Sequence, residues 1–347
     1  SWRRCGTVQP SLSVVRRKPK DRSRLEGLAG RLQLALRTCS RRAGDEVDSY
    51  LYVGSGFLRL AIEERLLAKA RQARVRRELE AVVAELSKAI SLDHQPFSAT
   101  ARGLVVPASS VKGNVRSRLE LSFARGREGF RSCFIRASGA GRPPARGQQG
   151  WRHYRIWEES LREERGSPCD CTGGWEECEV CLLCDLFGTA GLQGLVSFSD
   201  FVGERVETER LNLPTGEKLE AVKPGSVFKG SVTFRSLEPV ELGLLLYGMG
   251  LRDSRVGKPV LLGKLKYRRD LPHVFGVVRY ELQKLELAPF SQPLKVDGLE
   301  IPPGGGAEGE VLGRLVAGLV KLVRTTYGGE LLDVDEVGAV ERLEARV

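Results

Sequence analysis

Hydrophobic side chains recur along this chain at the two spacings that distinguish strands from helices. Residues 28–38 alternate between apolar and other positions, with Leu32, Leu34 and Leu36 on one side of an expected strand. Short apolar or alternating runs predict further strands over residues 104–106, 195–198, 227–234 and 274–282. Apolar residues at helical spacing predict helices over residues 61–91, 238–250 and 308–326.

The stretch 103–120 predicts a strand that ends and a helix that begins within a few residues. Pro107 has no N–H to donate, so it stops the strand. Ser109 and Ser110 can then cap a helix by accepting its free backbone N–H groups. The apolar stripe of that helix is Val111, Val115 and Leu119. With Lys112 and Arg116 beside the helix start, we expect an anion site and phosphate as the anion. The alternative is an ordinary capped surface helix.

The order of the elements predicts the fold class. Strand, helix, strand followed by strand, helix, strand is the ferredoxin-like or RRM-like plan of an α+β protein. We expect this core over residues 26–300, with a helical insertion at 58–91 and an arginine- and cysteine-rich insertion at 122–185. Residues 301–347 are expected to form a C-terminal helical extension.

The charge of the chain narrows the class of partner. Of the 347 residues, 41% are hydrophobic, which is enough for a core, and the net charge is +11. A basic protein of this size favours a polyanion, nucleic acid before membrane, although simple solubility is the alternative. No apolar run reaches the roughly 18 residues that a membrane span needs, and the start lacks a signal-peptide pattern. We therefore expect a cytoplasmic protein with no membrane partner.

Two segments concentrate the basic residues. Residues 1–25 contain eight basic residues against one acidic residue, Asp21. They predict either a solvated arm or an arm that grips RNA or a partner. Residues 122–166 interleave arginines with aromatics such as Phe134, Trp151 and Trp157. Arginine with aromatics suits RNA through phosphate pairing and base stacking, and a disordered surface insertion is the alternative.

Clustered cysteines predict a metal site. Five of the eight cysteines fall within sixteen residues, at Cys169, Cys171, Cys178, Cys181 and Cys184. The last three supply thiolates at C-x-x-C-x-x-C spacing, and one of the first two completes a tetrahedral Zn²⁺ site. Five candidates for four positions leave the ligand set open, with His153 as a distant substitute. We expect a structural zinc, since a catalytic zinc keeps an open position and usually has His or carboxylate ligands.

Several segments resemble the RAMP superfamily, the repeat-associated mysterious proteins that bind RNA in CRISPR effector complexes. Residues 107–113, PASSVKG, are similar to the family's I-P-G-S-S-x-K-G signature, with Ala108 at the usual glycine. Residues 181–188 and 194–200 follow its C-x-x-C-x-L-F-G and G-x-V-x-F-x-D pattern, and residues 219–228 resemble its E-x-V-x-P-G-S-x-F segment. The resemblance implies a RAMP core that serves as a backbone subunit of a type III effector. Guide RNA, complementary target RNA and neighbouring effector subunits in a filament-like assembly are the implied partners.

The resemblance also implies which residues contact RNA. They belong to a polar turn after the first strand, a glycine motif after it, the phosphate-binding helix and a late glycine-rich loop with lysines. These positions are Arg41, Arg42, Gly54, Gly56, Ser109, Ser110, Lys112, Gly113, Arg116, Lys264 and Lys266.

A catalytic carboxylate is implied at Asp93. It lies ten residues before Gly103, where the family places an aspartate credited with target-RNA cleavage. Together with Mg²⁺ or another divalent cation it would stabilise charge on the phosphate or activate the attacking oxygen. The alternative is a plain turn residue, and Asp45 and Asp48, which also follow the first strand, are the fallback candidates.

Three functions remain open from the sequence. The first is a backbone subunit that binds guide RNA and cuts target RNA as a metal-dependent endoribonuclease. The second is a non-cutting or end-capping RAMP subunit of the same complex. The third is a stand-alone, zinc-stabilised RNA-binding protein unrelated to CRISPR.

Overall fold

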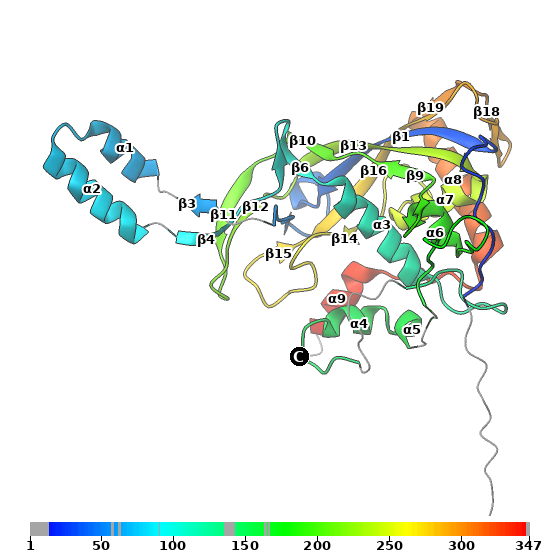
Figure 1. Ribbon diagram of the computed structural model, residues 1–347, viewed down its shortest axis with the longest axis horizontal. Helices are drawn as coiled ribbons and strands as arrows, with labels where there is room; N and C mark the ends of the chain where they lie inside the picture. The colour runs from blue at the N-terminus through cyan, green and yellow to red at the C-terminus, as the bar shows by residue number, and fades with distance from the viewer. Residues whose placement is uncertain are drawn as a thin grey trace, which may run out of the picture.

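A long antiparallel sheet forms the centre of the molecule (Figure 1). The computed structural model describes residues 14–56, 59–61, 64–89, 91–134, 143–162, 165 and 167–344. Its strands lie in the order β14-β16-β1-β13-β10-β6-β5, with β9 paired to β13 and β19 paired to β16. Their bounds are β1 Leu28–Thr38, β5 Ala99–Thr100, β6 Gly103–Val106, β9 Val196–Phe198, β10 Phe201–Arg205, β13 Val227–Leu237, β14 Val260–Leu261, β16 Val277–Leu287 and β19 Gly306–Glu308.

The connections of the four central strands confirm the predicted fold class. In chain order β1, β10, β13 and β16 are the first to fourth strands of the core, and in space they lie 4-1-3-2. Helix α3, Ala108–Ser122, lies between the first and second strands along the chain, and α7, Pro239–Gly248, lies between the third and fourth. This is the ferredoxin-like arrangement of an α+β protein.

The predicted apolar alternation of β1 faces the core. Leu32 and Leu34 are at most 1% exposed, and Leu32 is paired with Val232 of β13. The helical stripe of α3 belongs to the same hydrophobic cluster. Gly248 lets α7 approach α3 closely, since an added Cβ would lie 2.8 Å from Leu119 Cγ. Truncating a buried leucine such as Leu119 to alanine would cost about 2–5 kcal/mol.

The helical insertion is a hairpin of two helices and not the single helix expected over residues 61–91. Helices α1, Glu64–Gln72, and α2, Arg76–Ala89, project beyond one end of the main sheet (Figure 1). The Arg74 N–H donates to Glu78 Oε2 at 3.0 Å, which starts α2 anew, and Lys69 pairs with Glu85 at 3.1 Å across the hairpin. Residues 64–89 contain neither glycine nor proline, so the sequence carries no signal for the break.

A second, smaller sheet carries this hairpin. Its order is β11-β12-β4-β3, with bounds β3 Arg59–Ala61, β4 Ser91–Gln95, β11 Thr208–Asn212 and β12 Lys218–Val222. The remaining elements are η1 Arg41–Ala43, β2 Ser49–Tyr50, α4 Trp151–Ile156, α5 Glu158–Leu161, α6 Leu182–Phe187, β7 Gly188–Thr189, β8 Leu192–Gln193, β15 Val274–Phe275, β17 Leu294–Val296, β18 Leu299–Ile301, α8 Gly309–Tyr327 and α9 Glu336–Glu344. The single strand expected over residues 274–282 is therefore divided between β15 and β16.

The described part of the basic N-terminal segment is tied down within the chain. Arg17 pairs with Asp185 at 3.3 Å and with Glu241 at 3.1 Å, and Arg22 pairs with Asp185 at 2.5 Å. Lys20 also pairs with Glu241. Both carboxylates are at most 3% exposed, so these cations neutralise buried charges. The interpretation of residues 1–25 as a free RNA-gripping arm does not hold for these three, and residues 1–13 lie outside the described residues.

The helix after β19 packs into the core. Helix α8 contacts α7 and β16, and its inward side buries Leu315, Leu319 and Val323. Helix α9 lies beside α4 and β14, with Val340 fully buried. Within the described part of the chain, no helix has the length and apolar content to cross a bilayer.

Candidate functional site

The start of α3 is capped by Asp200, the last residue of the G-x-V-x-F-x-D segment. The Ala108 N–H donates to Asp200 Oδ1 at 2.8 Å. Asp200 reaches this position because β6 pairs with β10, which places Val106 opposite Phe201. The expectation that Ser109 and Ser110 cap the helix is wrong, because the helix begins at Ala108 and both serines lie inside its first turn. The Asp200 carboxylate therefore takes the favourable position for negative charge at this helix end.

The α3 residues that were predicted to contact RNA lie on different sides of the helix. Ser110 and Gly113 line a pocket between α3 and the loop 261–267, which we call the α3 pocket. Ser109 and Lys112 line a separate hollow of about 240 Å³ beside Phe198. Burial, followed by the nearby Arg116 charge, lowers the pKa of Lys112.

Arg116 is bonded within the protein and is only 14% exposed. Its Nε donates to Glu120 Oε1 at 2.7 Å, and its Nη1 donates to the Gly188 carbonyl at 2.7 Å. Its Nη2 donates to Cys184 Sγ at 3.3 Å. These contacts occupy three of the five N–H donors of the guanidinium, so Arg116 is held against the cysteine-rich segment, and its contact with RNA stays a prediction. The helical period had placed it beside Lys112, but the cysteine-rich segment packs on that side of α3.

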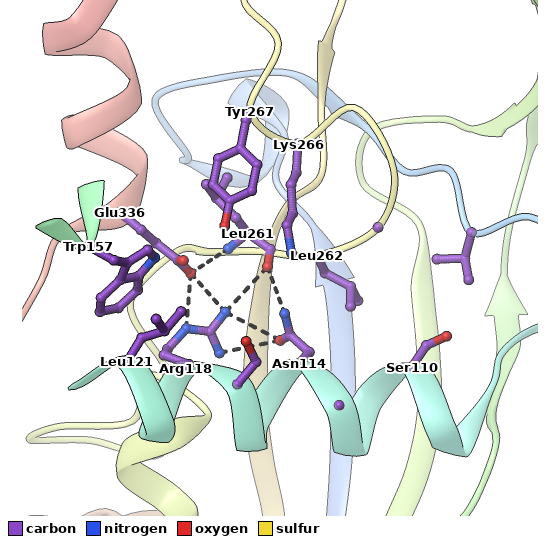
Figure 2. Close-up of a pocket in the computed structure, with 14 residues that line it drawn as sticks. Ser110, Asn114, Arg118, Leu121, Trp157, Leu261, Leu262, Lys266, Tyr267 and Glu336 are labelled. Atoms are coloured by element: carbon purple, nitrogen blue, oxygen red, sulfur yellow. Dashed lines mark hydrogen bonds and ion pairs between the residues drawn. The ribbon is translucent and has the colours of Figure 1, made fainter. Parts of the chain in front are cut away.

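The α3 pocket has a volume of about 330 Å³ and is built around a buried ion pair (Figure 2). Arg118 Nη2 pairs with Glu336 Oε1 at 2.7 Å, and the same oxygen accepts from the Leu261 N–H at 2.7 Å. Asn114 Nδ2 donates to the Leu261 carbonyl at 2.7 Å. Breaking such a buried pair leaves an uncompensated charge, which costs about 3–5 kcal/mol. The network therefore fixes the loop after β14 against α3.

Lys264 and Lys266, both predicted to contact RNA, lie on the loop 261–267 that borders the α3 pocket. Gly263 of this loop packs closely against the segment of Tyr52. Gly263 has a φ of +85°, and an added Cβ would lie 2.5 Å from the Tyr52 carbonyl oxygen. The Lys264 N–H donates to that oxygen at 3.0 Å, while its Nζ pairs with Glu217 at 2.5 Å. Lys266 lines the α3 pocket, and burial lowers the pKa of its ammonium group.

The glycine motif after the first strand lies beside the same pocket. Val53, which precedes Gly54, forms part of the pocket lining. Gly54 is exposed and bridges to Phe97, and Gly56 has a φ of +82° with open space around its Cα. The structure thus gathers Gly54, Ser110, Gly113, Lys264 and Lys266 from three separate segments.

Arg41 and Arg42 lie in a different groove. Both are exposed on η1, and the groove of about 1170 Å³ beside them also contains Arg205, Lys223 and His273. The fallback carboxylates hold this turn in place. Asp45 Oδ1 pairs with Arg279 Nε at 2.6 Å, and Asp48 Oδ1 accepts from the Arg41 N–H at 3.0 Å.

Asp93 lies on β4 of the smaller sheet, and its side chain is outside the described residues. The next residue, His94, is paired with Lys218 of β12 and with Arg59 of β3. Further along the same strand, Gln95 Oε1 lies 3.3 Å from Lys264 Nζ. The strand of Asp93 therefore runs next to the lysine-bearing loop, and its catalytic role stays a prediction.

Four buried cysteines meet in one cluster: Cys133, Cys169, Cys181 and Cys184. Their sulfurs all lie within 4.8 Å of one another, and each residue is at most 2% exposed. A tetrahedral Zn²⁺ with Zn–S bonds of about 2.3 Å needs sulfurs about 3.8 Å apart. The sulfurs of Cys133 and Cys184 are 3.4 Å apart and those of Cys133 and Cys181 are 3.8 Å apart. The donor set therefore fits a structural zinc.

The cluster differs from the predicted ligand set in its members. Cys171 and Cys178 are joined to each other in a disulfide and stay outside the cluster. Cys133, 36 residues before Cys169, takes the remaining place. No spacing rule could have found it, because the long arginine-rich segment separates it from the others. His153 is not a ligand, since its Nδ1 lies 2.8 Å from the Tyr267 hydroxyl, and burial lowers the pKa of His153 to about 4.

Backbone and side-chain donors surround the cluster sulfurs. The Cys181 N–H donates to Cys169 Sγ at 3.2 Å, and the Cys184 N–H donates to Cys181 Sγ at 3.4 Å. Hydrogen bonds, the largest from Cys133, lower the pKa of Cys181 and bring that of Cys169 to about 7, whereas hydrogen bonds within the same cluster raise the pKa of Cys133 and Cys184. The two thiols with the lowered pKa are therefore the readiest to bind zinc, because zinc binds the thiolate form.

Comparison with known proteins gives the family. No curated protein sequence matches this chain. The profile of the RAMP superfamily matches residues 46–269, a stretch that includes α3, the α3 pocket loop and the cysteine cluster. Because the matched stretch covers well over half of its length, the chain belongs to the RAMP superfamily.

Proposed function

We propose that this protein is a subunit of a type III CRISPR effector that binds guide RNA and contacts complementary target RNA. Membership of the RAMP superfamily suggests a CRISPR-associated RNA-binding role. The observation that carries the proposal is the meeting of three distant segments at the α3 pocket. Val53, Gly113 and Lys266 all line it, although they are far apart in the sequence.

The groups around the α3 pocket suit contacts to an RNA backbone. Lys266 in the α3 pocket and Lys112 in the neighbouring hollow form no ion pair within the described part of the chain, so both are available for phosphate. Gly54 and Gly56 are exposed and have no side chain, so a sugar–phosphate chain can approach the backbone closely at both positions. Contacts to phosphate and sugar fix the register of the RNA and leave its bases free to pair with a target.

The cysteine cluster is proposed to hold one structural zinc through Cys133, Cys169, Cys181 and Cys184. When bound, the metal supplies folding free energy and keeps no open position for chemistry. Arg116 connects the cluster to α3 through its bond to Cys184 Sγ. The zinc would thereby stabilise the position of α3, whose opposite side lines the α3 pocket.

Cleavage of target RNA through Asp93 and a divalent cation is a finer hypothesis within this proposal. Its support is the closeness of β4 to the Lys264 loop through Gln95. A non-cutting or end-capping subunit of the same complex is the alternative. Neighbouring effector subunits and a cytoplasmic location follow from the same assignment. A stand-alone zinc-stabilised RNA-binding protein would share the RNA contacts but have no such neighbours.

The proposal is tested by fluorescence anisotropy with a labelled single-stranded RNA that carries the repeat of the host's CRISPR array. Affinity should fall linearly with the logarithm of salt concentration, because bound lysines release counterions. Lys112→Met should weaken binding and reduce the salt slope by about one. Lys295→Met is the matched control, since this exposed lysine of β17 is paired with Glu300 on a hairpin away from the α3 pocket.

Two results would contradict the proposal. If the parent protein shows no salt-dependent affinity for RNA, it is not an RNA-binding subunit. If it binds RNA but never co-purifies from its host with a guide RNA and other effector subunits, the stand-alone function replaces the CRISPR assignment.

A further inference from the structure

The cysteine-rich loop is an acidic surface on an otherwise basic protein. Residues 167–204 contain no lysine or arginine, although the chain has 55 of these residues. Glu176, Glu177 and Glu179 of this segment are exposed, and none of them forms an ion pair within the described residues. Because negative charge repels a polyanion, the surface suits a positively charged protein and not RNA.

The same loop, residues 172–179, holds a tryptophan in solvent, and we call it the Trp175 loop. Trp175 is 46% exposed. The Cys171–Cys178 disulfide closes the loop, and the Cys178 N–H donates to the Trp175 carbonyl at 3.2 Å. The ring is therefore presented on a loop of fixed shape, which lowers the entropic cost of binding. Tryptophan is also enriched among the few residues that dominate protein interfaces.

A second exposed apolar surface lies on the helical hairpin. Val75, Leu79 and Val83 follow one another at four-residue spacing along α2 and the residue before it, and each is 47–56% exposed. The Leu79 N–H donates to the Val75 carbonyl at 3.2 Å, so the helical path already includes Val75. Residues at this spacing lie on one face of a helix, and together they form a continuous apolar stripe.

Unpaired positive charge lies around the start of this stripe. Arg71, Arg74 and Arg77 are exposed, and their side chains form no ion pair in the part of the chain that the structure describes. The carboxylates Glu80 and Glu85 are already paired inside the hairpin. The hairpin surface, which we define as the stripe and these three arginines, thus joins apolar area to positive charge. The Trp175 loop joins apolar area to negative charge.

The two surfaces belong to opposite ends of the molecule. Helices α1 and α2 project at one end, and α6, which follows the Trp175 loop, lies toward the other end (Figure 1). A contact between the surfaces therefore joins two molecules. We infer that the Trp175 loop of one copy binds the hairpin surface of a second copy, with the indole on the apolar stripe and the glutamates beside the arginines. Such a heterologous contact repeats from copy to copy and forms an open chain.

The experiment is sedimentation velocity over a concentration series, on nuclease-treated protein in a buffer without reductant. The parent should form species longer than dimers as its concentration rises, and added salt should weaken this association. Trp175→Ala should weaken it at least about thirtyfold, as expected for loss of an interface tryptophan. Phe290→Ala is the matched control, because Phe290 is 62% exposed but lies outside both surfaces, and it should assemble like the parent.

A mixing experiment tests whether the two surfaces bind each other. Leu79→Lys removes the apolar centre of the hairpin surface at an exposed helix position, so it should be monomeric like Trp175→Ala. Each variant keeps the surface that the other has lost. An equimolar mixture should therefore form dimers and nothing longer, because only one contact is possible. This complementation also requires that both variants are folded.

Three outcomes would overturn the inference. The first is a parent that stays monomeric across the concentration series, and the second is Trp175→Ala that assembles like the parent. The third is a mixture of the two variants that stays monomeric, because the surfaces then do not bind each other. Neither surface includes a residue that lines the α3 pocket, and the assay contains no RNA. Failure of this inference therefore leaves the proposed RNA binding intact, and a parent that assembles without binding RNA contradicts only the proposed function.

Discussion

A glycine in the middle of α3 provides a test in which stability and RNA binding should change in opposite directions. Gly113 lies well inside the helix Ala108–Ser122, and an added Cβ there meets no atom within 4 Å. Glycine in a helix interior is less stable than alanine by roughly 0.5–1 kcal/mol. Nothing inside the protein requires the missing side chain. Gly113→Ala should therefore stabilise the fold by that amount, which raises the melting temperature by about 1 °C for a chain of this size.

The same methyl group should harm RNA binding. It would project into the entrance of the α3 pocket, where we propose that RNA approaches the helix. An added methyl in a close contact typically costs about 1–3 kcal/mol, so the affinity for RNA should fall at least about fivefold. Anisotropy titrations and differential scanning calorimetry on the same preparation measure the two effects together.

The matched control is Gly313→Ala. Gly313 lies inside α8, Gly309–Tyr327, and an added Cβ there also meets nothing within 4 Å. Its substitution should give the same small stabilisation and leave RNA affinity unchanged. If both variants bind RNA like the parent, Gly113 does not face RNA and the proposed path is wrong. If Gly113→Ala lowers the stability, a methyl group does not fit beside Gly113 as the structure indicates.

Three further predictions concern the metal, the cleavage and the pocket lysine. Purified protein should contain about one zinc by elemental analysis. Cys133→Ser should lose the zinc and melt at a lower temperature, whereas Cys171→Ser should keep it. Loss of zinc from Cys171→Ser but not from Cys133→Ser would restore the ligand set expected from the sequence. In the assembled complex with Mg²⁺, Asp93→Ala should bind complementary RNA but no longer cut it, and equal cutting by parent and variant would remove Asp93 from catalysis. Because burial lowers the pKa of Lys266, its protonated form contributes to phosphate binding below that pKa and is lost as pH rises through it. RNA affinity should thus decline before the usual lysine range near pH 10.4 is reached, and parallel pH profiles for the parent and Lys266→Met would exclude the contact.

Local patterns in the sequence were sufficient for the fold class and for the positions of β1, β6, β9, β13, α3, α7 and α8. The alternation of Leu32, Leu34 and Leu36 reports burial of one strand face directly, because successive strand residues point to opposite sides. The helix after Pro107 and the helices near residues 239–248 and 309–327 follow from the same kind of rule. The break in the helical insertion was missed, since good helix formers run through it without glycine or proline.

The partners of the site residues were decided only by tertiary contacts. Asp200 caps α3 because β6 and β10 are neighbours in the sheet, and Cys133 joins the cluster across a long insertion. Arg116 turns inward for the same reason, since the cysteine-rich segment packs on its side of the helix. The sequence alone determined where the longest strands and helices of the core lie and which residue types are available for phosphate and zinc. Which of those residues meet depended on strand pairing and packing between segments that are distant along the chain, and no local spacing records such contacts.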